Sequence, residues 1–78
     1  MKKRIHLYTS NVMKELRMKN NWSQQLLADK MGISRSFLKS IENETAPDHL
    51  NVFHLNLLGE IFNVSPRIFL PETSILED

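Results

Sequence analysis

The side chains best suited to chemistry lie together, between residues 23 and 43 of a 78-residue chain. This segment is rich in serine, glutamine and asparagine, and it carries Lys30, Arg35 and Lys39. Arginine and lysine bind phosphates, and arginine can also bind the edge of a guanine through two parallel hydrogen bonds. Serine is short enough to let a backbone approach a ligand closely. These residue types indicate contact with a polyanion.

The distribution of charge supports the same interpretation. The net charge is only +1, but residues 1–39 hold nine basic and two acidic side chains, a balance of +7, while residues 40–78 have a balance of −6. A strongly basic segment favours a polyanionic partner such as nucleic acid. The alternative is chance clustering in a short chain.

Other kinds of chemistry find no support. The chain has no cysteine, which excludes disulfides and thiol catalysis. His6, His49 and His54 share no helix face and no acid cluster, so they indicate neither a metal site nor a catalytic triad. No glycine-rich phosphate loop is present, and no apolar run could span a membrane or form a signal peptide. We therefore expect a cytoplasmic protein that is not an enzyme, without cofactor, metal or membrane partner.

Two short helices separated by a glycine turn should hold the polar segment. Ser23 is placed to cap the first helix, and Gly32 supplies the left-handed residue that ends it. Ser34 caps the second helix, which runs from Arg35 to about Glu42. Leu38 and Ile41 define its buried side, so Ser36, Lys39 and Ser40 lie opposite them, with Arg35 on the flank.

Further helices are expected on both sides of this pair. Thr9 or Ser10 should cap a first helix that ends at Asn20-Asn21, and a fourth should start after Asp48 or Asn51 and end at Asn63. Ser65, with Pro66 at the first helical position, should begin a short fifth helix that ends at Pro71. Residues 5–8 and 74–76 are alternatives for short, paired terminal strands.

These elements resemble the lambda-repressor-like (XRE) helix-turn-helix family. The resemblance covers about Val12 to Leu70 and is carried by Leu16-Arg17, Ser23-Gln24, Leu27-Ala28, Gly32-Ile33-Ser34, Ile41-Glu42-Asn43 and Asn63-Val64-Ser65. It implies an all-α, five-helix bundle, which we assign to a DNA-binding domain at 9–70. The charged residues outside that domain indicate a basic arm at 1–8 and an acidic tail at 71–78. The resemblance also implies an ion pair between Arg17 and Glu42, which would fix the second helix of the motif to the first helix of the chain.

The implied function is a sequence-specific transcriptional regulator, with repression favoured, that inserts helix 34–42 into the major groove of double-stranded DNA. The resemblance places a phosphate contact at Gln24, and Ser23 can combine capping with such a contact. The expected DNA-binding residues are Ser23, Gln24, Ser34, Arg35, Ser36, Lys39, Ser40 and Asn43.

Two features depart from the family pattern or extend it. Acidic residues, Glu44 and Asp48, occupy a loop that should face phosphates and would weaken binding there. The fourth helix carries two apolar stripes, of which the second needs a cover. We expect a homodimer through this second stripe, which comprises Leu50, Phe53, Leu57 and Ile61. The alternative function is a protein-interaction module or antitoxin, with a protein partner, that retains the helix-turn-helix scaffold.

Overall fold

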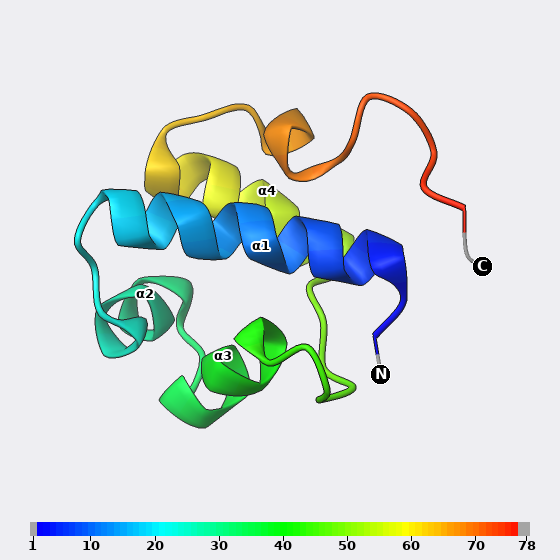
Figure 1. Ribbon diagram of the computed structural model, residues 1–78. Coiled ribbons are helices and arrows are strands. Elements are labelled where there is room, and N and C mark those ends of the chain that lie inside the picture. The colour runs from blue at the N-terminus through cyan, green and yellow to red at the C-terminus, as the bar shows by residue number, and fades with distance from the viewer. Residues whose placement is uncertain (1, 77–78) are drawn as a thin grey trace.

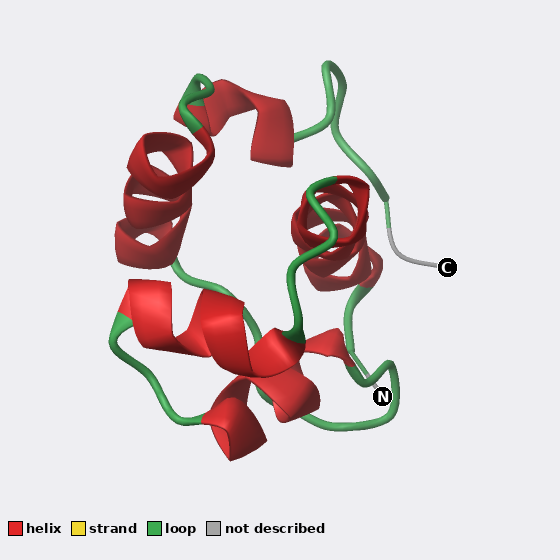
Figure 2. Ribbon diagram, turned by 90° about the vertical axis from the view of Figure 1, so that its left-hand side faces the viewer, coloured by secondary structure: helices red, strands yellow, loops and turns green. Residues whose placement is uncertain are grey.

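The fold is given by a computed structural model that describes residues 2–76. Four α-helices and one 3-10 turn follow in order: α1 (Arg4–Lys19), α2 (Gln24–Met31), α3 (Arg35–Glu42), α4 (Val52–Phe62) and η1 (Pro66–Phe69). Helix α1 runs across the molecule, with α2 and α3 on one side, and α4 and η1 on the other (Figure 1). Figure 2 views α1 nearly end-on and shows α4 beside it.

Every element contributes to one apolar core. Fully buried side chains come from α1 (Met13), α2 (Leu27), α3 (Leu38), α4 (Leu58) and η1 (Phe69). Because a chain of this size buries only about 60% of the surface that its unfolded form exposes, less than larger domains bury, each helix depends on contact with the others for stability. Trp22 is half-buried and stacks on Phe62 with ring centroids 5.0 Å apart.

The helix ends follow their local chemistry closely. The Ser23 and Ser34 hydroxyls accept hydrogen bonds from the backbone N–H groups of Leu26 and Phe37, as expected for N-caps. Gly32 has a φ of 72° and Asn63 a φ of 55°, so both ends are left-handed. Of the two starts considered for α4, the structure selects the cap at Asn51.

Helix α1 begins earlier than predicted. It starts at Arg4, and Thr9 and Ser10 are buried inside it instead of capping it. Both hydroxyls donate to the carbonyl of His6, at 3.1 Å for Thr9 and 2.8 Å for Ser10. These hydrogen bonds satisfy the two buried hydroxyls within the helix, so neither residue needs to lie at a helix end. The alternative of a strand at 5–8 is therefore wrong, because these residues lie in α1.

The C-terminal half differs from the prediction in two ways. The predicted fifth helix is a 3-10 turn of four residues, Pro66–Phe69, because the short segment before Pro71 leaves no room for α-helical turns. Residues 74–76 form no strand. They nevertheless lie beside the start of α1, where Arg4 Nη1 donates to the Leu76 carbonyl at 2.8 Å (Figure 1).

Glycine is required at one position inside α4. A Cβ atom on Gly59 would lie 2.8 Å from Cγ of Pro66, closer than two carbon atoms can approach. The missing side chain lets η1 return directly onto α4, and this contact places Phe69 in the core.

Candidate nucleic-acid interface

Helices α2 and α3 contact each other across the Gly32 turn and present a polar surface. Arg35, Ser36 and Lys39 are exposed on α3, whereas Leu38 and Ile41 are fully buried on its other side. The serine caps at both helix starts use their oxygen atoms as acceptors, which leaves each hydroxyl proton able to donate to a ligand. This surface therefore combines two cations with several short donors.

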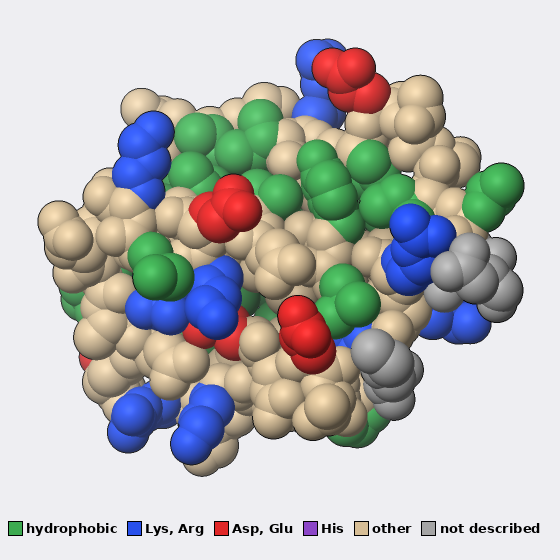
Figure 3. Space-filling model, in the orientation of Figure 1, with side chains coloured by type: hydrophobic (Ala, Val, Ile, Leu, Met, Phe, Trp, Pro, Cys, Tyr) green, Lys and Arg blue, Asp and Glu red, His purple; other side chains and the backbone are tan. Residues whose placement is uncertain are grey.

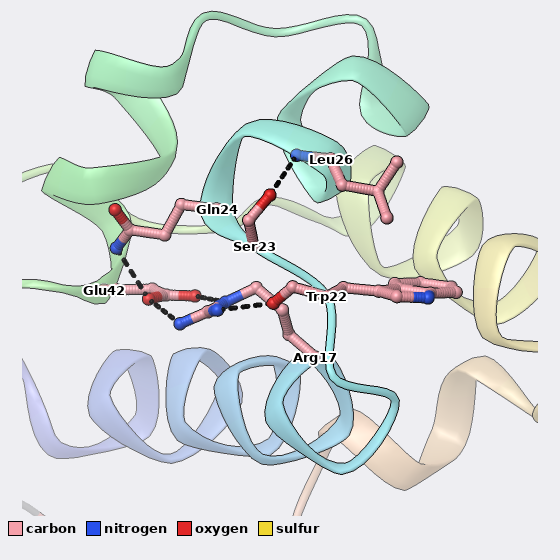
Figure 4. Close-up of polar contacts among 6 residues, drawn as sticks. All are labelled: Arg17, Trp22, Ser23, Gln24, Leu26 and Glu42. Carbon is pink, nitrogen blue, oxygen red and sulfur yellow. Dashed lines mark hydrogen bonds and ion pairs between the residues drawn. The ribbon is translucent and has the colours of Figure 1, made fainter.

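An ion-pair network fixes the orientation of α3. Arg17 on α1 donates to both carboxylate oxygens of Glu42 on α3, from Nε at 2.8 Å and from Nη2 at 2.9 Å (Figure 4). The expected pair is therefore present, and it is well shielded, because the two side chains are only 11% and 4% exposed. Arg17 Nη1 also donates to the Trp22 carbonyl at 2.8 Å, which joins the α1–α2 turn to the pair.

Gln24 belongs to the same network. Its Nε2 donates to Glu42 Oε1 at 3.0 Å, so α1, α2 and α3 all meet at one carboxylate (Figure 4). The second proton of this amide remains able to donate outward. The side chain of Gln24, at which a phosphate contact is predicted, is thus positioned by Glu42.

The end of α3 is secured from a direction that the sequence did not indicate. The Lys2 ammonium donates to the carbonyl of Ser40 at 2.9 Å and to that of Asn43, and its side chain is buried, at 7% exposure. A cation stabilises the negative end of a helix, where carbonyls lack partners. Burial lowers the pKa of Lys2, whereas the nearby carboxylates of Asp48 and Glu44 act in the opposite direction.

The acidic loop after α3 is held against the polar surface. Ser40 Oγ donates to Asp48 Oδ2 at 2.6 Å, and the Asn43 side chain accepts hydrogen bonds from the backbone N–H and the hydroxyl of Thr45, at 3.0 and 2.9 Å. Ser40 is therefore half-buried and committed to the loop. Of the predicted DNA-binding residues, it is the least accessible on α3.

A depression between α1, α2 and α3 adds residues that the sequence analysis did not select. Its lining comprises Lys14, Arg17, Met18, Gln24, Lys39, Glu42 and Asn43. Figure 3 shows several lysine and arginine side chains, in blue, at the lower left of the molecule, where α2 and α3 lie. The spacing of Lys14, Arg17 and Met18, which share one face of α1, was the available signal.

The predicted dimer residues do not form one exposed stripe. Leu50 is buried in the core at 4% exposure, and Leu57 and Ile61 are half-buried against it. Phe53 is 70% exposed, and its neighbour Val52 is 82% exposed. The chain therefore covers most of the second stripe itself and leaves the first turn of α4 uncovered.

The histidines lie near the loop and α4. The rings of His6 and His49 stack with centroids 3.7 Å apart, and His54 Nδ1 accepts a hydrogen bond from the Asn51 backbone N–H at 3.1 Å. Burial, together with His49, lowers the pKa of His54. Within residues 2–76, no three histidine, cysteine or acidic side chains are grouped to hold a metal ion.

A capped helix, a glycine turn and an exposed polar helix define the helix-turn-helix class, whose second helix enters the major groove of DNA. A comparison with protein-family models matches residues 13–69 to a family described as helix-turn-helix. The chain belongs to this family, that of the lambda-repressor-like (XRE) DNA-binding domains. No match came from curated proteins or from solved structures. Across residues 2–76, no helix is long and apolar enough to cross a membrane.

Proposed function

We propose that the protein is a sequence-specific transcriptional regulator of double-stranded DNA, with repression favoured, and that it reads the major groove with α3. The observation that carries this proposal is the exposed Arg35, Ser36 and Lys39 on a helix whose opposite side is fully buried. Membership of a DNA-binding family supports it.

The geometry suits the division of work in such complexes. Arg35 lies in the first turn of α3, the part of a recognition helix that contacts base edges. Ser36 beside it lets the helix approach the groove closely. Ser23, Ser34 and Gln24 lie at the starts of the two helices, where side-chain and backbone donors suit phosphate oxygens.

The acidic loop after α3, which was expected to weaken DNA binding, has part of its negative charge neutralised. Asp48 is hydrogen-bonded to Ser40. Burial lowers the pKa of Lys2, and both Asp48 and Glu44 lie close enough to its ammonium group to oppose that shift. Glu42, Glu44 and Asp48 therefore repel phosphates less than three carboxylates without such partners would. Glu42 is itself paired with Arg17.

Replacing Arg35 by alanine tests the proposed groove contact. We expect Arg35→Ala to cost about 1–3 kcal/mol of binding to a selected operator and to relax specificity at one base pair, because a bidentate base contact is lost. Anisotropy of a labelled duplex measures both. Lys19→Ala, which removes a charge from the exposed end of α1, is the matched control. Equal affinities of the two variants for operator and for random DNA would contradict the assignment.

One observation favours a second function, that of a protein-interaction module or antitoxin. Val52 and Phe53 are exposed large apolar residues on adjacent positions of α4. They can serve the proposed homodimer or a different protein. Absence of binding to duplex DNA even at low salt would favour this second function over DNA regulation.

A further inference from the structure

The proposed function leaves Lys39 with two roles, a base contact or a phosphate contact, and the depression beside it decides between them. Lys39 precedes Glu42 by three residues on α3, and Lys14 precedes Arg17 by three residues on α1. Residues three apart share a helix face, so both lysines flank the Arg17–Glu42 ion pair, one from each helix. They line the same depression.

The charge of this depression suits an anion. Its lining contains three cations, Lys14, Arg17 and Lys39, and one carboxylate, Glu42, for a balance of +2. The carboxylate is held at the centre of the network, where Arg17 and Gln24 occupy its oxygens. The two lysines are exposed, so their ammonium groups are the cations able to reach a ligand.

The depression also adjoins the surface that meets DNA. It includes Gln24, at the start of α2, and Asn43, at the end of α3. A duplex seated on α3 has one backbone strand on each side of that helix, because the two strands border the groove that the helix enters. The anion that would lie closest to the depression is then a phosphate of the DNA backbone.

We infer that Lys14 and Lys39 bind one DNA phosphate between α1 and α3, with the outward amide proton of Gln24 as a further donor. Lys14 thereby becomes a DNA-contacting residue of α1. Lys39 is assigned to the backbone, and Arg35 is left as the base-reading cation of α3. This inference rests on the proposed function.

The expected signature is electrostatic and independent of sequence. Loss of one phosphate contact makes the slope of log affinity against log salt less steep by about 0.9. Because the two lysines share one phosphate, Lys14→Gln and Lys39→Gln should each show part of this change and the double variant all of it. Each single variant should weaken binding about three- to tenfold at low salt, equally for operator and random duplex. Arg35→Ala should instead reduce the difference between the two duplexes.

The control and a gain-of-charge variant sharpen the test. Lys19→Gln removes the same charge from the same helix outside the depression, and it should leave the slope unchanged. Met18 lines the depression and is 58% exposed, so Met18→Lys should steepen the slope and strengthen binding to both duplexes. Circular dichroism checks that each variant is folded.

The possible results distinguish a failure of the phosphate site from a failure of the proposed DNA-binding function. If wild-type protein binds duplex DNA but Lys14→Gln keeps the slope of Lys19→Gln, the phosphate site is overturned and the regulator remains. A greater loss on operator than on random DNA for Lys39→Gln would overturn its assignment to the backbone. If wild-type protein binds no duplex at low salt, the proposed function itself fails, and the phosphate site with it.

Discussion

Arg17 joins three elements through one guanidinium group. It bonds to Glu42 of α3 with two nitrogens and to the Trp22 carbonyl with the third, while Gln24 of α2 bonds to the same carboxylate. A guanidinium is suited to this task because its donors form a planar fork that matches a carboxylate. Shielding from water makes each charge depend on the other.

We predict strong coupling between the members of this pair. Arg17→Met or Glu42→Met alone should each cost about 3–5 kcal/mol of unfolding free energy, because each leaves an unpaired buried charge. The double variant should be less destabilised than the sum of the two. Urea denaturation followed by circular dichroism measures all four proteins of the cycle. Additive losses would show that the ion pair contributes little.

The sequence reached this pair through the family resemblance, but it could not reach Lys2. The Lys2 contact joins residues about forty positions apart in the chain. Helical periodicity predicts contacts only between residues that are close in sequence, so it could not indicate this one. A lysine near a terminus looks like a solvated cation in sequence. Only the fold places it beneath the carbonyls at the end of α3.

At the scale of the elements, α4 depends on a titratable cap. Asn51 accepts from the His54 N–H at 2.9 Å, and His54 Nδ1 accepts in return from the Asn51 N–H. This is a capping box in which histidine replaces the usual glutamate or glutamine. An imidazolium cannot accept a hydrogen bond, so the cap requires the neutral ring.

The cap should make stability fall in mild acid. The pKa of His54 is lower in the folded protein than its ordinary value of about 6.5, so the unfolded chain binds the proton first. The stabilisation is complete above pH 6.5 and is lost as the pH falls through the folded pKa. Urea unfolding between pH 7.5 and 5 measures this dependence. His54→Gln keeps an acceptor without titrating, and it should flatten the profile.

The other histidines give an internal comparison for that prediction. His49→Gln leaves the capping box intact but removes the smaller of the two causes that lower the pKa of His54, so its pH profile should keep a reduced form of the wild-type decline. A decline that survives His54→Gln unchanged would place its origin elsewhere in the molecule.

Most element boundaries were predictable because they depend on neighbours in sequence. Ser23, Gly32, Asn51 and Asn63 each act within one turn of their own helix, and the structure confirms them. The start of α1 could not be predicted in this way. In the sequence, a buried threonine or serine whose hydroxyl donates to a carbonyl in the preceding turn looks the same as an N-cap. Burial, which depends on the whole fold, decides between the two.

At the scale of the whole molecule, the charge asymmetry of the sequence is partly cancelled in space. Basic Arg17 and Lys2, from the first half, lie against acidic Glu42, Glu44 and Asp48, from the second. What remains uncompensated at the depression is the exposed pair Lys14 and Lys39. A linear count of charge therefore predicted a polyanionic partner, but it could not separate the cations that are compensated in the fold from those that are exposed.

The dimer proposal now rests on a smaller surface than the sequence suggested. With Leu50 buried, the exposed turn of Val52 and Phe53 is what a second copy would cover. We predict that Phe53→Glu shifts the protein toward monomer in sedimentation experiments, because a carboxylate would be buried at the contact. Asn11→Glu, at an exposed position of α1 and outside α4, is the control. A wild-type protein that is monomeric at every concentration would contradict self-association through α4.

Trp22, the one tryptophan of the chain, lies where several of these interactions converge. Its ring stacks on Phe62 and has the Lys30 ammonium 4.8 Å from its centre, while its carbonyl accepts from Arg17. The emission of this single indole is therefore a built-in optical probe of the junction between α1, α2 and the end of α4. It can follow the loosening of that junction without any attached label.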